Sequence, residues 1–135
     1  MHKCTTAQLT GILFFALLMQ SCACSKTYIG NLRFGVTQTP KTVAAGQTID
    51  SKVNLLFSTT SVQIKFLGFQ SKEIKTNHYK IEAPAEIKTD GSGVANAALW
   101  IMDTIYSFKT TNPGQYIFDF YNTDELFKSD TVMVQ

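Results

Sequence analysis

From Ser25 onward the chain consists of short runs rich in Val, Ile, Phe, Tyr and Thr, separated by clusters of Pro, Gly, Asn and Asp. Such runs between turn residues are typical of β-strands. The run at 49–57 is the clearest, because Ile49, Val53 and Leu55 share one parity and polar residues take the other. Alternation of this kind indicates an antiparallel strand with one buried face. No long amphipathic helix pattern occurs, so we expect an all-β fold.

Other runs extend this pattern. In the first, Leu32, Phe34 and Val36 alternate with polar or small residues and are expected to face the core. The segment 94–102 is ambiguous, because its alanines suit a helix whereas its Trp and Ile suit a strand; we interpret it as extended. A strong turn signal, Asp-Gly-Ser-Gly, stands at 90–93. With turns roughly every 8 to 12 residues, the expected architecture is an antiparallel sandwich of about seven strands.

The segment that begins at Asn112-Pro-Gly-Gln-Tyr116 carries the most informative motif. Tyr116, Phe118 and Phe120 alternate with Gln115, Ile117 and Asp119, which predicts that the aromatic set faces the core and the other set faces solvent.

This motif resembles the tyrosine corner of immunoglobulin-like sandwiches, in which a Tyr near the start of the penultimate strand hydrogen-bonds to upstream backbone. Phe118 stands where antibody domains have a cysteine, and Trp100 lies outside the third strand. The resemblance therefore implies a disulfide-free immunoglobulin-like β-sandwich, of the kind found in bacterial envelope proteins, over residues 28–135, with Tyr116 as its structural corner. A small closed barrel is the alternative that periodicity leaves open.

The N-terminus has the layout of a secretion signal, with His2 and Lys3 before an apolar run at 11–19 and then polar residues. The run is about half of the roughly 20 apolar residues that a helix needs to cross a bilayer. A permanent transmembrane helix is therefore not expected.

The sequence Leu-Leu-Met-Gln-Ser-Cys at 17–22 resembles a bacterial lipoprotein signal, in which a peptidase cuts before a Cys that carries thioether-linked diacylglycerol. Ser21 supplies the small residue, whereas Met19 and Gln20 depart from the usual pattern. The resemblance implies that Cys22 is lipidated and that acyl chains such as palmitate anchor the protein in a membrane.

The same resemblance divides the chain into a signal peptide at 1–21, a lipidated tether at 22–27 and the sandwich domain. Cys24 is the competing attachment site, and a plain secretory signal is the other alternative. In such lipoproteins an Asp after the Cys favours retention in the inner membrane. In the related signals of Bacteroidetes, nearby acidic residues promote surface display. Ala23 and its neighbours provide neither, which implies an outer-membrane location facing the periplasm.

Charge and titratable residues argue against several function classes. After the signal, basic and acidic residues nearly balance and the lysines are scattered, so nucleic acid is not an expected partner. His78 is the only remaining histidine, which we interpret as a solvent-facing loop residue, and no nucleophile turn of the Gly-x-Ser-x-Gly type occurs. Four carboxylates near the C-terminus are interpreted as a solvated hairpin tip; they are Asp119, Asp124, Glu125 and Asp130. We therefore expect no catalytic residue, no metal and no cofactor.

Apolar residues on nominally exposed parities are the remaining candidates for a ligand- or partner-facing site. They are Leu67, Phe69, Trp100, Ile117 and Tyr121. We expect a non-enzymatic, lipid-anchored envelope module that binds or organises another envelope component. A carbohydrate-binding or adhesion module, in which Trp100 and Tyr121 stack on sugars, is one alternative. A subunit of a larger outer-membrane complex is the other.

Overall fold

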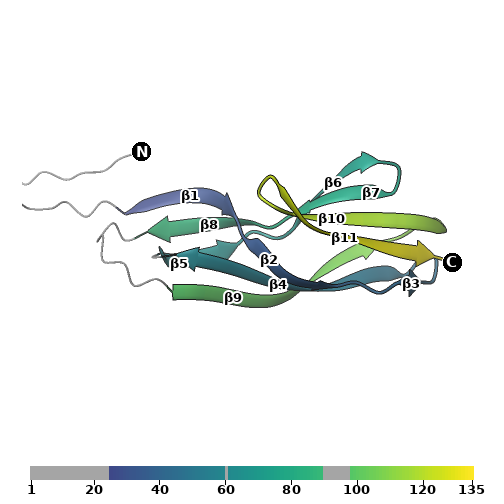
Figure 1. Ribbon diagram of the computed structural model, residues 1–135, viewed down its shortest axis with the longest axis horizontal. Coiled ribbons are helices and arrows are strands. Elements are labelled where there is room, and N and C mark those ends of the chain that lie inside the picture. Colours follow the sequence, from purple (N-terminus) through teal and green to yellow (C-terminus); the bar gives the residue numbers. More distant parts are fainter. Residues whose placement is uncertain (1–24, 60, 90–97) are drawn as a thin grey trace, which may run out of the picture.

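The computed structural model describes residues 25–59, 61–89 and 98–135, and these residues form β-strands without any helix (Figure 1). The all-β expectation is confirmed, but the described strands number 11 rather than about seven. They are β1 (Lys26–Asn31), β2 (Arg33–Gln38), β3 (Thr42–Val43), β4 (Thr48–Thr59), β5 (Ser61–Phe66), β6 (Gln70–Lys75), β7 (His78–Glu82), β8 (Pro84–Thr89), β9 (Ala98–Lys109), β10 (Gly114–Asn122) and β11 (Glu125–Val134). No helix in this described part is long and apolar enough to cross a membrane.

The strands form three sheets. The front sheet has the order β2-β4-β9, the large sheet β3-β11-β10-β7-β6, and the end sheet β1-β8-β5. Figure 1 shows an elongated molecule in which the end sheet and the large sheet follow one another along the long axis. The 12-residue strands β4 and β9 pair over their whole length and extend alongside both the end sheet and the large sheet.

The chain passes between the end sheet and the other two sheets at two single residues. Leu32 separates β1 from β2, and Ala83 separates β7 from β8. Both are fully buried, and the Leu32 amide donates to the Ala83 carbonyl over 2.8 Å. A buried backbone donor needs such a partner, so this hydrogen bond lets two strands change sheet at the same point without leaving the core.

Aromatic rings fill the core between the front and large sheets. Phe118 lies among three of them, with ring centroids at 5.3 Å to Phe108, 5.8 Å to Tyr106 and 5.9 Å to Tyr79. The pairs with Phe108 and Tyr106 are edge-on and the pair with Tyr79 is stacked. Aromatic pairs at these distances each contribute about 0.5–1.5 kcal/mol beyond the burial of their area. The inward parity predicted for Tyr116, Phe118 and Phe120 agrees with their burial.

The Tyr116 hydroxyl donates to the carbonyl oxygen of Asn112 over 3.1 Å, which is the upstream bond that a tyrosine corner makes. β10 and β11 form an antiparallel hairpin, and β4 pairs antiparallel with β9. However, β7 pairs with β10 in parallel, and β3 pairs with β11 in parallel. The large sheet is therefore mixed, whereas the front and end sheets are purely antiparallel, as sheets are in the immunoglobulin sandwich.

The prediction that Leu32, Phe34 and Val36 all face the core is wrong for Val36. A β-bulge between Phe34 and Val36 places Gly35 as an extra residue opposite β4. An extra residue reverses the parity of all that follow it. Val36 consequently lies outside and is 51% exposed, whereas Thr37 is buried in its place.

The segment expected to be extended at 94–102 is only partly described: residues 98–102 are the start of β9, and 94–97 lie outside the described residues. The turn at 90–93, the signal peptide and both attachment candidates, Cys22 and Cys24, also lie outside them.

Candidate functional site

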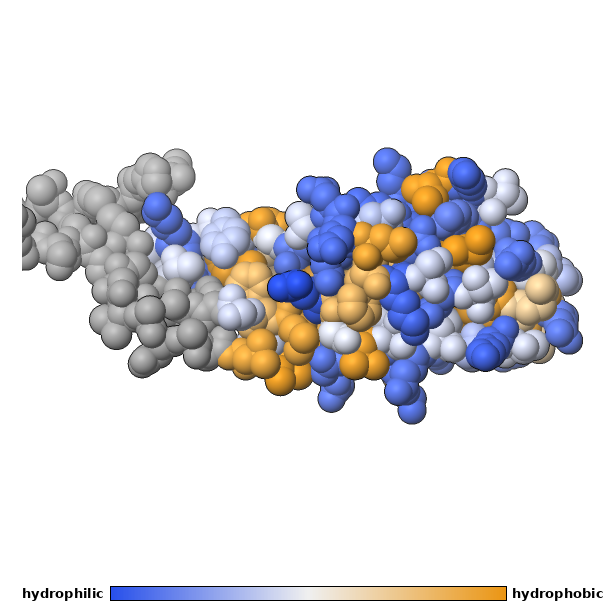
Figure 2. All heavy atoms as spheres, in the orientation of Figure 1, coloured by the Kyte–Doolittle hydropathy of each residue, from blue (hydrophilic) through white to orange (hydrophobic). Residues whose placement is uncertain are grey.

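Strand β9 is apolar on both faces. Its even-numbered residues pack against the core, among them Trp100, Met102, Tyr106 and Phe108. Its odd-numbered residues face outward, and Leu99, Ile101 and Ile105 are each more than half exposed. A strand with two apolar faces normally has both covered. In Figure 2 apolar side chains gather on the lower border of the molecule, where Figure 1 places the start of β9.

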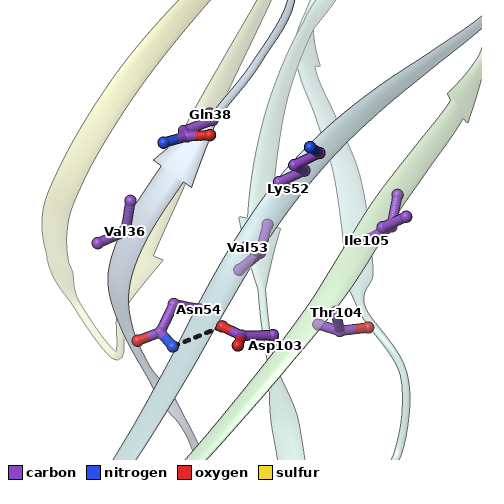
Figure 3. A pocket seen from close by; sticks show the side chains of 8 residues that line it. All are labelled: Val36, Gln38, Lys52, Val53, Asn54, Asp103, Thr104 and Ile105. Atoms are coloured by element: carbon purple, nitrogen blue, oxygen red, sulfur yellow. Dashed lines mark hydrogen bonds between the residues drawn. The ribbon is translucent and has the colours of Figure 1, made fainter.

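An open groove of about 620 Å³ crosses the outer face of the front sheet (Figure 3). We call it the groove, and residues of β2, β4 and β9 line it: Val36, Gln38, Lys52, Val53, Asn54, Asp103, Thr104 and Ile105. Its size falls in the range of about 300–1,000 Å³ that is usual for ligand sites. The aliphatic side chains of Val36 and Ile105 stand on its opposite sides, on the two border strands of the sheet.

The bulge at Gly35 explains how Val36 comes to line this groove. It turns Val36 to the outer face, next to Asn54 of the neighbouring strand. A Cβ atom on Gly35 would lie 2.6 Å from Leu56 Cδ1 and 2.8 Å from Asn54 Oδ1. Glycine at this position therefore lets the side chains of β4 lie across β2, and any larger residue would displace them.

The two charged side chains of the groove differ in whether another side chain holds them in place. The Asn54 side-chain amide donates to Asp103 Oδ1 over 2.7 Å, which orients the carboxylate across the β4–β9 pair (Figure 3). Lys52 lies opposite Ile105 and forms no salt bridge with any described residue. The groove thus combines the exposed aliphatic side chains of Val36 and Ile105 with several polar groups, among which the Asp103 carboxylate is oriented by Asn54.

β9 is also a border strand, since it pairs only with β4 among the described strands. One edge of a 12-residue strand therefore presents backbone N–H and C=O groups to which a further strand can bind. Chemically, the site can accept an extended chain along this edge and apolar side chains on the adjoining face.

The candidate residues from the sequence do not form one patch. Phe69 is partly buried, and its ring packs against the core, 5.0 Å from Phe66 and 5.4 Å from Tyr106. Leu67 is nearly half exposed beside it. Trp100 is partly buried against the core and lines a second hollow with residues of β5 and β8.

Ile117 and Tyr121 lie on the outer face of the large sheet and are partly buried. The Lys80 ammonium stands 4.8 Å from the centre of the Tyr121 ring, and it also forms a 3.1 Å ion pair with Glu82. Neither the Tyr121 ring nor the Trp100 indole is therefore a freely exposed platform.

The interpretation of His78 as a loop residue is wrong. His78 is the first residue of β7, and its Nε2 lies 2.6 Å from the carboxylate of Asp119 on the neighbouring strand β10. Asp119 was expected to face solvent, yet it is buried. The parallel pairing of β7 with β10 makes the two residues diagonal neighbours on one face, which no local pattern encodes.

The C-terminal carboxylates are dispersed. Asp130 accepts hydrogen bonds from the hydroxyls of Thr37, at 3.2 Å, and Thr39, at 2.7 Å, and pairs with Lys128 at 2.9 Å. Asp130 therefore ties β11 to the end of β2. Among the described residues no three His, Cys, Asp or Glu side chains lie close enough to hold a metal ion.

Two tyrosines of the core have perturbed acidity. Burial raises the pKa of Tyr106 from 10.0 to about 12, against a hydrogen bond to Ser71 that lowers it. Burial also raises the pKa of Tyr79, and the neighbouring Glu73 carboxylate raises it further. Both phenols are neutral at physiological pH and serve as packing groups.

Sequence reasoning missed the groove. A signal was present in β9, where apolar residues occupy both parities over Leu99–Ile101 and again at Ile105 and Tyr106. The exposure of Val36 had no such signal, because a bulge is not visible in parity alone.

No protein-family model, curated protein or solved structure matches this chain.

Proposed function

We propose that this chain is a non-enzymatic envelope module, anchored by lipid at Cys22, that binds an extended apolar segment of another envelope protein. The observation that carries the proposal is the groove beside the edge of β9 that pairs with no described strand. Exposed apolar side chains that gather beside polar ones are typical of interaction sites and ligand-binding grooves.

The geometry supports an extended protein segment as the occupant. A segment that pairs with the free edge of β9 gains backbone hydrogen bonds and places alternate side chains on the outer face. Those side chains would lie next to Ile105, while the Lys52 amine and the Asp103 carboxylate would select polar partners along the segment.

A glycan is the weaker candidate, because sugar stacking uses exposed aromatic faces. The groove is lined by aliphatic and polar side chains only. Trp100 and Tyr121, which the carbohydrate hypothesis required, are both partly buried.

The proposed fold family is the immunoglobulin-like sandwich, in a variant with a third sheet. The hydrogen bond from Tyr116 to Asn112 and the antiparallel β4–β9 pair support this relation. The lipid anchor is supported by the signal-like sequence at 17–22, and the lack of acidic residues beside Cys22 favours an outer-membrane location facing the periplasm.

Intact mass of the protein extracted from membranes tests the anchor. We expect a chain that begins at Cys22 and carries acyl mass. A chain that begins at Cys24 moves the attachment site by two residues, and an unmodified chain refutes the anchor.

Affinity purification of the tagged full chain from detergent-solubilised envelopes of the producing cells tests the groove. We compare the wild type with Ile105→Asp, which places a charge in the groove, and with Met133→Asp, an exposed site on the large sheet, as the matched control. We expect one stoichiometric partner that Ile105→Asp reduces at least about tenfold, as a charge desolvated in an apolar contact implies, and that Met133→Asp retains. Hydrogen exchange of the complex should show protection of the β9 amides.

Equal recovery of the partner with both variants refutes the proposed site. So does protection confined to strands of the large sheet.

A further inference from the structure

The distance between the proposed lipid and the domain is short. Cys22 precedes Lys26, the first residue of β1, by four positions. A fully extended chain spans at most about 3.6 Å per residue, so these four positions reach no further than about 14 Å. If Cys22 carries the lipid, as proposed above, the end of the domain that holds Lys26 must lie at the membrane surface.

This end of the molecule, which we call the anchor end, is formed by strand termini from two sheets. β1 begins there, and its register pairs Lys26 with Thr89 at the end of β8. β9 also begins there, and Leu99 pairs with Ser58 near the end of β4. Figure 1 shows these termini together on the side of the molecule opposite to the C-terminus.

The anchor end carries the two most exposed large hydrophobic side chains of the described residues. Ile29 on β1 is 63% exposed and Leu99 on β9 is 60% exposed. Tyr28 and Ile101, which neighbour them in the two strands, are also about half exposed. The two strands belong to different sheets, so these residues do not lie on one sheet face.

Because the exposed apolar residues lie on two different sheets, a planar surface fits them better than a protein bound to one sheet face. A protein bound to one sheet face would cover Leu99 or Ile29, but a planar surface that meets the end of the sandwich can contact both. Lys26 and Lys88 are exposed at the same end, on strands β1 and β8. Lysine near apolar side chains suits the boundary between anionic headgroups and acyl chains, and tyrosine is enriched there.

We propose that a collar formed by Tyr28, Ile29, Leu99 and Ile101, with Lys26 and Lys88, docks on the phospholipid bilayer that holds the lipid anchor. The domain then stands on the membrane by its anchor end. The groove, whose residues lie further along β4 and β9, stays open to a protein partner.

Trp100 provides a built-in reporter, because it is the only tryptophan and lies between Leu99 and Ile101. The acylated full chain is reconstituted into phosphatidylcholine vesicles that contain phosphatidylglycerol, with and without lipids brominated near the headgroup. We expect the brominated lipids to quench the Trp100 fluorescence of the wild type. The double variant Ile29→Asp with Leu99→Asp should lose most of this quenching, and Ile105→Asp in the groove should keep it.

Flotation with the vesicles and intact mass are measured on the same samples, and circular dichroism verifies that each variant is folded. Acylated, floating protein whose Trp100 is not quenched overturns the collar and leaves the lipid anchor standing. Quenching that the double variant retains overturns the collar as well. An unmodified chain that stays in solution overturns both the anchor and the collar.

Discussion

Replacement of Tyr106 by Phe should change the pH dependence of stability in a way that the structure specifies. The Tyr106 ring is 4% exposed and packs against Phe118 and Phe120, and its hydroxyl donates to Ser71 Oγ over 3.1 Å. Phenylalanine keeps the ring contacts and removes the hydroxyl. The variant therefore isolates one hydrogen bond and one ionisation.

The core favours the neutral phenol of Tyr106 over its ionised form, so the phenol contributes to stability only while it is protonated. Burial holds the pKa of Tyr106 at about 12 in the folded chain, whereas the unfolded chain has the ordinary value of 10.0. A raised pKa means that this contribution is complete below pH 10 and is lost as pH rises through 12. Each pKa unit corresponds to about 1.4 kcal/mol, so a loss of about 2–3 kcal/mol is expected over that interval.

Loss of the hydrogen bond lowers the stability of the variant, whereas ionisation lowers the stability of the wild type at high pH. Near pH 8 the Tyr106→Phe variant should be less stable than the wild type by about 1 kcal/mol, the usual net value of one such bond. Near pH 12 the wild type should have become the less stable protein by about 1–2 kcal/mol, because only the wild type carries the phenol of residue 106.

Urea unfolding followed by Trp100 fluorescence, at a series of pH values from about 8 to about 12, measures this difference. Tyr79 is present in both proteins, and its Coulombic effect on the pKa of Tyr106 is smaller than that of burial, so the difference reports mainly on burial of the Tyr106 hydroxyl. A difference that stays constant across the series would refute the argument that burial of the Tyr106 hydroxyl sets its acidity.

Two further changes test the contacts that position the strands. Tyr116→Phe removes the hydroxyl that donates to Asn112, and should lower the free energy of unfolding by about 1–2 kcal/mol with the core unaltered; an unchanged urea midpoint would show that this bond contributes nothing. Asp130→Ala removes the acceptor shared by Thr37 and Thr39, and should lower stability by about 2–3 kcal/mol because the Thr37 hydroxyl is buried. Asp130→Asn, which keeps one acceptor oxygen, should lose less in the same calorimetric or urea measurement, and an equal loss would contradict the explanation.

The contacts of individual residues show where sequence reasoning succeeded. Ile49, Val53 and Leu55 were expected to be buried and they are, because no bulge interrupts the pairing of β4 with β9. Tyr116 and Phe118 follow the same rule in β10. Period-two alternation is a local property, so it survives wherever the ladder is regular.

Other residues show where it failed. Val36 faces outward because Gly35 inserts an extra residue. The pair of His78 and Asp119 depends on the parallel alignment of β7 with β10, strands that are far apart in the chain.

The candidate site illustrates the same division. Leu99 and Ile105 are a sequence signal, which sequence reasoning did not use, that β9 is apolar on both faces. No local pattern could show that no described sheet covers its outer face. Coverage depends on which strands pair and where the sheets end, which is a non-local outcome.

The sequence by itself therefore determined the all-β class and the inward face of the regular strands, because each rests on neighbouring residues. Only the tertiary structure decided the three-sheet arrangement, the groove and the apolar anchor end. Those features arise from long-range pairing, and the free energy of such pairing is set by packing between strands that local alternation cannot specify.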